Sequence, residues 1–99
     1  MVRSKKNKSV QERLDTEILN SEIFQILFRN RPELREIARQ RLVPVAGDLI
    51  IDQLGMNEQD RAMVTSECQI VINVAASVNF DDPLLDALEI NYFGCLRML

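Results

Sequence analysis

The stretch IVINV at residues 70–74 carries the main indication of the fold. It is short and apolar on both faces, which is typical of a strand in a parallel sheet buried beneath helices. A second β-type run, LVPVA at residues 42–46, contains Pro44, which has no backbone N–H and therefore favours the edge of a sheet. Residues 1–3 are at most a scrap of strand. We therefore expect two strands and the stub of a third.

Helix signals fill the intervals around these strands. Ser9 and Glu12 form a capping box, in which each side chain accepts a hydrogen bond from the other residue's backbone, and Asn20-Ser21 predicts a break. Later helices are expected from Pro32 to about Gln40, from about Glu58 to Ser66 behind an Asn57 cap, and from Pro83 onward behind an Asp82 cap. The order of elements is a βαβαβα pattern. The predicted fold class is therefore α/β with a parallel sheet, in one domain over residues 1–99.

The composition excludes several kinds of site. The chain has no His, which rules out Ser-His-Asp triads, Cys-His dyads and His-ligated metal sites. Cys68 and Cys95 are too few for a zinc site or a disulfide framework, so we expect no metal and a reducing compartment. We expect both cysteines to be buried and to act as small apolar residues. No apolar run approaches the roughly 18–20 residues that cross a bilayer, so no membrane segment is expected.

Charge is unevenly distributed along the chain. The net charge is −3, but residues 1–13 hold five Lys and Arg against one Glu and so carry +4, which leaves −7 for the rest. An anion can bind near the start of the chain. Nucleic-acid backbones are bound by a broad basic face with aromatic platforms, and the chain has only four Phe and one Tyr. We therefore expect no nucleic-acid partner.

Four stretches, taken in order, resemble motifs of the fatty acyl-CoA reductases. They are residues 2–5 with 8–14 (VRSK and KSVQERL), 43–49 with 54–56 (VPVAGDL and LGM), 72–81 (INVAASVNFD) and 90–94 (INYFG). The resemblance covers nearly the whole chain. It implies the extended short-chain dehydrogenase/reductase fold, a doubly wound NADP-binding Rossmann domain. Residues 1–99 would then form a partial, doubly wound parallel sheet, an incomplete Rossmann fold that lacks the first strand.

Two parts of the family's pattern are not found in these residues. One is the glycine-rich turn after the first strand, which cradles the cofactor's pyrophosphate at a helix N-terminus. The other is the Tyr-x-x-x-Lys pair that supplies the proton, because Tyr92 is followed four places on by Leu96. We therefore expect an internal piece of a reductase that is neither stably folded nor active by itself.

The resemblance also implies cofactor-binding residues. Arg3, at the end of the second strand, would pair with the 2′-phosphate of NADP through its planar fork of donors, and Arg13 would join it by folding back from the first helical turn. Asp48 would accept a hydrogen bond from the exocyclic amine of adenine, and Leu49 would pack on the ring. Without the resemblance, Arg3 belongs to a solvated basic end together with Lys5, Lys6 and Lys8, and Asp48 is a common turn residue.

The resemblance implies roles for three further residues. Ala75 and Ala76 are small where the backbone would approach the ribose and phosphate closely, although tight strand–helix packing explains them equally well. Asn91, the implied catalytic group, would bond backbone and hold a water in the proton relay. The plainer interpretation of Asn91 is a buried amide satisfied by backbone.

The activity implied by the resemblance is reduction of a long-chain acyl-CoA to a fatty alcohol with NADPH, by way of the aldehyde. Family members often lie on the cytosolic side of intracellular membranes, so a cytoplasmic or membrane-face location is expected. Two alternatives stay open. One is the thioester-reductase domain of a carrier-protein-linked enzyme, and the other is a truncated, non-catalytic binding protein that pairs its open strand edges with another chain.

Overall fold

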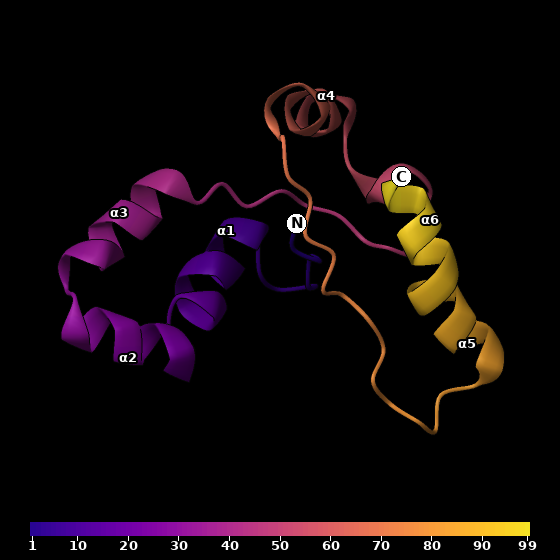
Figure 1. Ribbon diagram of the computed structural model, residues 1–99, viewed down its shortest axis with the longest axis horizontal. Coiled ribbons are helices and arrows are strands. Elements are labelled where there is room, and N and C mark those ends of the chain that lie inside the picture. Colours follow the sequence, from indigo (N-terminus) through magenta and orange to yellow (C-terminus); the bar gives the residue numbers. More distant parts are fainter. The chain divides into compact units, whose positions relative to one another are not determined.

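The computed structural model describes all 99 residues as two compact units, Met1–Ala46 and Gly47–Leu99 (Figure 1). The first unit contains α1 (Val10–Arg13), the π-helical turn η1 (Leu14–Ile18), α2 (Glu22–Asn30) and α3 (Glu33–Arg41). The second contains the short η2 (Asp52–Gly55), α4 (Glu58–Glu67), α5 (Leu84–Leu88), the π-helical turn η3 (Glu89–Phe93) and α6 (Gly94–Met98). Beyond the helices, the regular structure consists of two isolated β-bridges.

Most helices begin where the sequence predicts. The Ser9 hydroxyl accepts from the N–H of Glu12 at 3.2 Å, and the Glu12 carboxylate accepts from the N–H of Ser9 at 2.8 Å, so the capping box is confirmed. The break at Asn20-Ser21 is also confirmed, because α2 begins directly after it. Asn57 Oδ1 accepts from the N–H of Asp60 at 2.7 Å, which confirms the cap of α4.

The last helix begins one position later than predicted. Pro83, rather than Asp82, precedes its first helical residue, Leu84. The Asp82 carboxylate is engaged elsewhere, since it accepts from Asn79 Nδ2 at 2.6 Å and from the Ser77 hydroxyl. The prediction that Asp82 caps this helix is therefore wrong, because the side chain folds back onto the loop before it.

A small apolar core holds the first unit together. Leu14, Leu19 and Phe28 are only 6%, 3% and 6% exposed, and side chains of α2 and α3 pack around them. The ring of Phe24 lies 5.8 Å from that of Phe28, between centroids, and the Arg35 guanidinium lies 5.1 Å from the centroid of the Phe28 ring, a cation–π contact. Phe28 is therefore buried in this core, and Phe24 is partly buried against it.

One feature of the expected sheet is present in the first unit. Val2 forms a parallel bridge with Ala46, in which the N–H of Val2 donates to the carbonyl of Val45 at 2.7 Å. The direction is that of neighbouring strands in a parallel sheet. A single bridge is not a strand, however, so the partial parallel sheet stays a prediction.

Residues 70–74 have no regular secondary structure here, although a buried strand was expected. Ile70 and Val74 are 80% and 87% exposed. A strand needs a neighbour to pair its backbone N–H and C=O groups, and no segment of this chain pairs with this one. Cys68 and Cys95 are exposed as well, so the expectation that both are buried is wrong.

The second unit is organised around one continuous run of helix. The elements α5, η3 and α6 follow one another without a break, and we call residues 84–98 the C-terminal rod (yellow in Figure 1). The rod contacts η2, and Gly94 is its buried position. Neither the rod nor any other helix combines the length and the apolar character needed to cross a bilayer.

Candidate cofactor-binding site

The residues that the sequence assigns to the cofactor fall into three groups. The first unit contains Arg3 and Arg13, and the second contains the pair Asp48–Leu49 and the set Ala75, Ala76 and Asn91.

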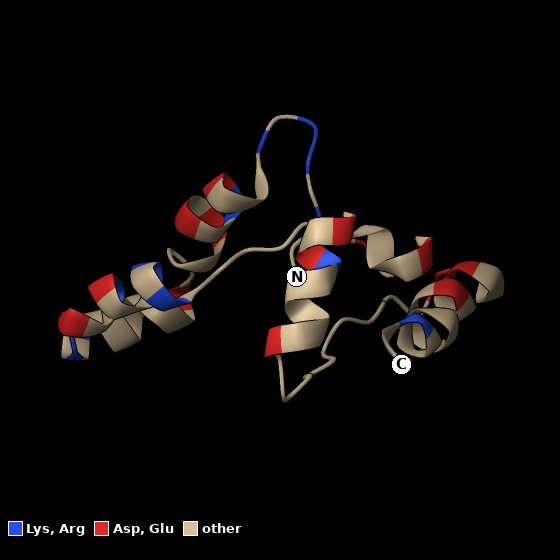
Figure 2. Cartoon of the chain, turned by 90° about the horizontal axis from the view of Figure 1, so that it is seen from above, with Lys and Arg blue, Asp and Glu red and all other residues tan.

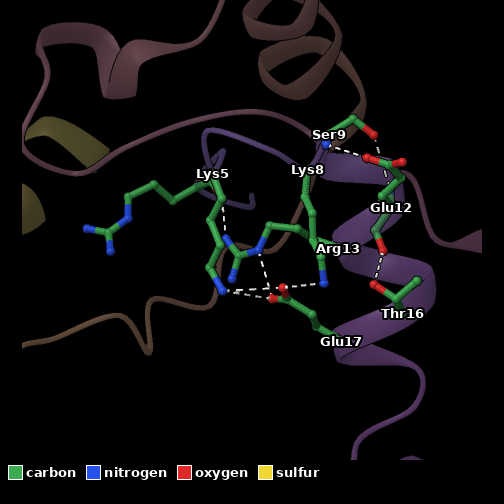
Figure 3. A network of polar contacts seen from close by, with 8 residues as sticks. Lys5, Lys8, Ser9, Glu12, Arg13, Thr16 and Glu17 are labelled. Atoms are coloured by element: carbon green, nitrogen blue, oxygen red, sulfur yellow. Dashed lines mark hydrogen bonds and ion pairs between the residues drawn. The ribbon is translucent and has the colours of Figure 1, made fainter.

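Glu17 is the centre of an ion-pair network in the first unit. Its carboxylate lies 2.9 Å from Nε of Arg13 and 3.3 Å from Nζ of both Lys5 and Lys8. Figure 3 shows these three side chains converging on it. Arg13 and Glu17 are four positions apart, a spacing that places them on the same face of a helix. We call these four residues the Glu17 network.

The network favours the charged form of Glu17. The hydrogen bond from Arg13, with smaller contributions from Lys5 and Lys8, lowers the pKa of Glu17 from 4.5 to about 2, although desolvation opposes the shift. The carboxylate is therefore ionised at neutral pH and offsets part of the positive charge of this segment.

Arg13 connects the Glu17 network to Arg3. While Nε of Arg13 is held by Glu17, its Nη1 donates to the backbone carbonyl of Arg3. The arginine thus folds back toward Arg3 as expected, but it contacts the backbone of that residue. The Arg3 guanidinium itself is exposed and has no hydrogen bond or ion pair with the rest of the chain. Figure 2 shows Lys and Arg gathered on the loop that precedes α1.

In the second unit, Asp48 begins a tight turn. Its N–H donates to the carbonyl of Leu54 at 2.7 Å, and its Oδ1 accepts from the N–H of Ile50 at 3.2 Å. Its backbone carbonyl accepts from the N–H of Ile51 at 3.2 Å. The second carboxylate oxygen, Oδ2, has no donor within the chain. Asp48 therefore keeps an acceptor available for a ligand.

The turn closes through a strained backbone. Gln53, Leu54 and Gly55 have φ values of 55°, 60° and 59°, which lie in the left-handed region. Only glycine adopts this region without a steric penalty, which costs other residues roughly 1–2 kcal/mol each. Leu54 is buried, at 8% exposed, and its carbonyl accepts from Asp48, so packing and hydrogen bonding offset the strain.

Leu49 is fixed by the C-terminal rod. It is 7% exposed, and it approaches Gly94 so closely that a Cβ at that glycine would lie 3.1 Å from the Cβ of Leu49. Arg97 Nη1 donates to the Leu49 carbonyl at 2.9 Å, and the same guanidinium pairs with Glu89 and, at 3.5 Å, with Asp52. Leu49 thus packs on the rod in this structure, and its packing on an adenine ring stays a prediction.

Asn91 holds the loop that contains the two alanines. Its Oδ1 accepts from the N–H of Ser77 at 2.8 Å, and its Nδ2 donates to the carbonyl of Ser77 at 3.1 Å. The side-chain amide thus satisfies both backbone groups of one residue. Ala75 and Ala76 directly precede Ser77, and both are exposed. Asn91 is exposed, so the expectation of a buried amide is wrong, although its contact with backbone is as expected. That contact belongs to both interpretations of Asn91, so its role in a proton relay stays a prediction.

A second connection between this loop and the rod comes from Asn73. Its Oδ1 accepts from the N–H of Ala75 at 3.3 Å, and its Nδ2 lies 3.2 Å from Sγ of Cys95. The loop is therefore shaped on both sides of the alanines. No group of three or more acidic or Cys side chains is placed to hold a metal ion.

Some residues of these contacts were not identified from the sequence. Glu17 had a signal, because it follows Arg13 at the spacing of a helical ion pair. Gly94 was quoted only as part of a motif, and Arg97 had no signal, since its contact with Leu49 spans 48 positions. The structure brings Arg3 and Arg13 together in one unit, whereas the other assigned residues lie in the second.

The class of protein is given by comparison with known families. Residues 1–99 match an NAD-binding family described as male sterility protein. The match spans the whole chain, so the chain belongs to this family. A nicotinamide cofactor is the ligand that such a family implies.

Individual relatives are more specific. The chain is 38% identical to fatty acyl-CoA reductase 1 of Arabidopsis thaliana over 102 residues, and 38% identical to fatty acyl-CoA reductase 8 of the same plant. It is 27% identical to fatty acyl-CoA reductase 1 of Mus musculus over 99 residues. Each match covers all of this chain but only 21%, 21% and 18% of the relative. No solved structure matches the chain. The resemblance to fatty acyl-CoA reductases is confirmed.

Proposed function

We propose that this chain is the part of a fatty acyl-CoA reductase that holds the adenosine end of NADPH. The observation that carries the proposal is the match of all 99 residues to an NAD-binding family, along the same span in which the relatives are named fatty acyl-CoA reductases. The chain spans about a fifth of the length of these relatives, with 21% of the Arabidopsis protein covered.

The proposed reaction has two reductive steps. A long-chain acyl-CoA accepts a hydride at its carbonyl carbon, the C–S bond breaks, and the leaving thiolate of CoA takes up a proton from solvent, which leaves the aldehyde. The aldehyde then accepts a second hydride and a proton to give the fatty alcohol. The nicotinamide cofactor supplies the hydrides, so two molecules are oxidised for each CoA released. The residues assigned in this chain bind and orient the cofactor.

Arg3 supports NADPH, rather than NADH, as the cofactor. Its guanidinium has no acidic partner within the chain, while the nearby carboxylate of Glu17 is already bound by three other basic groups. A planar guanidinium matches a phosphate with paired donors. At the end of a second strand, a basic residue fits the 2′-phosphate and an acidic one fits the ribose hydroxyl.

The adenosine side is proposed on the Asp48 and Ala75–Ala76 loops. Asp48 Oδ2 is available to accept from the adenine amine, and the exposed alanines leave their backbone accessible to a ribose or phosphate. The proposed frame is a partial Rossmann sheet, in which residues 1–3 and 42–46 are neighbouring parallel strands. The bridge between Val2 and Ala46 supports this order.

The experiment replaces the matching segment of Arabidopsis fatty acyl-CoA reductase 1 with residues 1–99, and we call the product the grafted reductase. With a long-chain acyl-CoA and NADPH, we expect fatty alcohol, free CoA and two oxidised cofactors per CoA. A folded graft that binds no nicotinamide cofactor would contradict the proposal. An acyl-carrier-protein thioester offered in parallel tests the thioester-reductase alternative, which predicts preference for that substrate.

A further inference from the structure

We infer that Arg13 and Glu17 are positioning residues, which hold the backbone of Arg3 so that the Arg3 guanidinium reaches the 2′-phosphate while Arg13 does not touch it. The inference rests on the proposed function and extends it to residues that act through Arg3. It also changes the role of Arg13, which was expected to bind the 2′-phosphate directly beside Arg3.

The contacts of Arg13 carry the first step. Its Nε is 2.9 Å from the Glu17 carboxylate, and its Nη1 donates to the Arg3 carbonyl. The side chain is only 19% exposed. Because the guanidinium is planar and rigid, fixing two of its three nitrogens orients the whole group. Arg13 is thus a clamp between a helix-borne carboxylate and the backbone of Arg3.

The contacts of Glu17 carry the second step. The same carboxylate also binds Lys5 and Lys8, and these two residues form an antiparallel bridge in which the N–H of Lys8 donates to the carbonyl of Lys5 at 3.2 Å. Glu17 therefore holds both arms of the loop that follows Arg3. Figure 3 shows Glu17 and Arg13 on the α1–η1 side and the lysines on the loop.

The energetic consequence is preorganisation. An arginine on a mobile backbone loses conformational freedom when it binds a phosphate, and fixing its backbone beforehand lowers that cost. Three of the five basic groups in residues 1–13 are engaged with Glu17, so Arg3 and Lys6 are left without an acidic partner. Of these two, only Arg3 has its backbone held by Arg13.

Direct contact between Arg13 and the 2′-phosphate predicts the opposite effect of a substitution at Glu17. If Arg13 contacted the phosphate directly, Glu17 would compete with that phosphate for the same guanidinium. Removing the charge of Glu17 would then strengthen binding of a 2′-phosphate. If Glu17 positions Arg3 through Arg13, removing its charge weakens that binding.

The test measures binding of adenosine 2′,5′-bisphosphate and of 5′-AMP to the grafted reductase by calorimetry, at one fixed ionic strength. Arg3→Gln should lower affinity for the bisphosphate about 10-fold and leave 5′-AMP unchanged. Glu17→Gln and Arg13→Lys should each lower the affinity for the bisphosphate about three-fold or more. In Arg13→Lys the reason is that a Lys cannot bridge both Glu17 and the Arg3 carbonyl. Glu22→Gln is the matched control, because it makes the same chemical change as Glu17→Gln at a residue without an ion pair. It should change the affinity for the bisphosphate less than about two-fold.

Each outcome separates the two proposals. Tighter binding of the bisphosphate by Glu17→Gln, or no change, overturns the positioning role while leaving the Arg3 site intact. An unchanged affinity in Arg3→Gln overturns the proposed phosphate site itself. A shorter graft, residues 1–20, contains the whole Glu17 network and is measured in parallel, so that poor folding of the longer graft does not hide the result.

Discussion

At the scale of single residues, Glu17 and Arg97 have similar roles in different units. Each is a charged side chain in a helical segment that binds several partners: Glu17 holds the loop after Arg3, and Arg97 holds the carbonyl of Leu49, 48 positions away. Both support residues assigned to the cofactor without being assigned to it themselves. A site built on loops depends on such supports, because loop backbone has few hydrogen bonds of its own.

Titration of Glu17 tests its network. Because the folded pKa of about 2 lies below the ordinary value of 4.5, the network's contribution to stability is present above pH 4.5 and is lost as the pH falls through about 2. All four residues lie within residues 5–17, so the network needs no distant strand. We expect the carboxyl carbon of Glu17 to titrate with a midpoint near 2 by NMR in the grafted reductase, where the network is folded, and to move upward in Arg13→Gln. A midpoint at 4.5 would show that the network does not form.

Substitution of Arg97 tests the hold on Leu49. Arg97→Met keeps most of the side chain's length but removes the donor to the Leu49 carbonyl and the pairing with Glu89. We expect the grafted reductase to lose about 1–3 kcal/mol of unfolding free energy in urea, as for a charge-assisted hydrogen bond. Arg61→Met is the matched control on an exposed position without an ion pair, and should stay within about 0.5 kcal/mol. Equal effects of the two changes would argue against the contact.

At the scale of elements, two of the three helix caps expected from the sequence are present, whereas the expected strand at residues 70–74 has no regular secondary structure. The capping box of Ser9 and the Asn57 cap connect residues three positions apart, so their partners are visible in the sequence. The run at 70–74 has the composition of a buried strand, but a strand depends on a neighbour that its own sequence does not specify. The Asp82 cap failed for a related reason, since Ser77 and Asn79 compete for the same carboxylate.

The capping box itself gives a prediction at this scale. Ser9→Ala removes the acceptor for the N–H of Glu12 and should cost about 1 kcal/mol of local stability at α1. It should also loosen Arg13, which lies in α1, and so weaken binding of adenosine 2′,5′-bisphosphate to the grafted reductase. Ser4→Ala, an exposed position with no hydrogen bond, is the control. Amide exchange of residues 10–18 is the measurement, and unchanged protection in Ser9→Ala would contradict the prediction.

At the scale of the whole molecule, the isolated chain has little buried apolar surface. Only six large apolar side chains are buried, and none of them is buried completely. The apolar stretch 70–74 is exposed along most of its length. Because stability arises chiefly from apolar burial, this chain should not form a stable cooperative fold alone.

Thermal melting tests that expectation. We expect the isolated 99 residues to show a gradual loss of helical circular dichroism and fast amide exchange across residues 70–74. The grafted reductase should instead melt cooperatively, with slow exchange in the same residues, since neighbouring strands would then pair with them. A sharp, cooperative melt of the isolated chain with protected amides would refute the expectation.

The central claim is that Arg3 selects a cofactor that carries a 2′-phosphate. Its most direct test is the ratio of the dissociation constants for NADH and NADPH in the grafted reductase, with Arg3 intact and with Arg3→Glu. We predict a preference for NADPH of at least about 10-fold with Arg3, and a reversal toward NADH with Glu, because a carboxylate repels the phosphate and accepts from the ribose hydroxyls. A ratio that does not change between the two proteins would contradict the account.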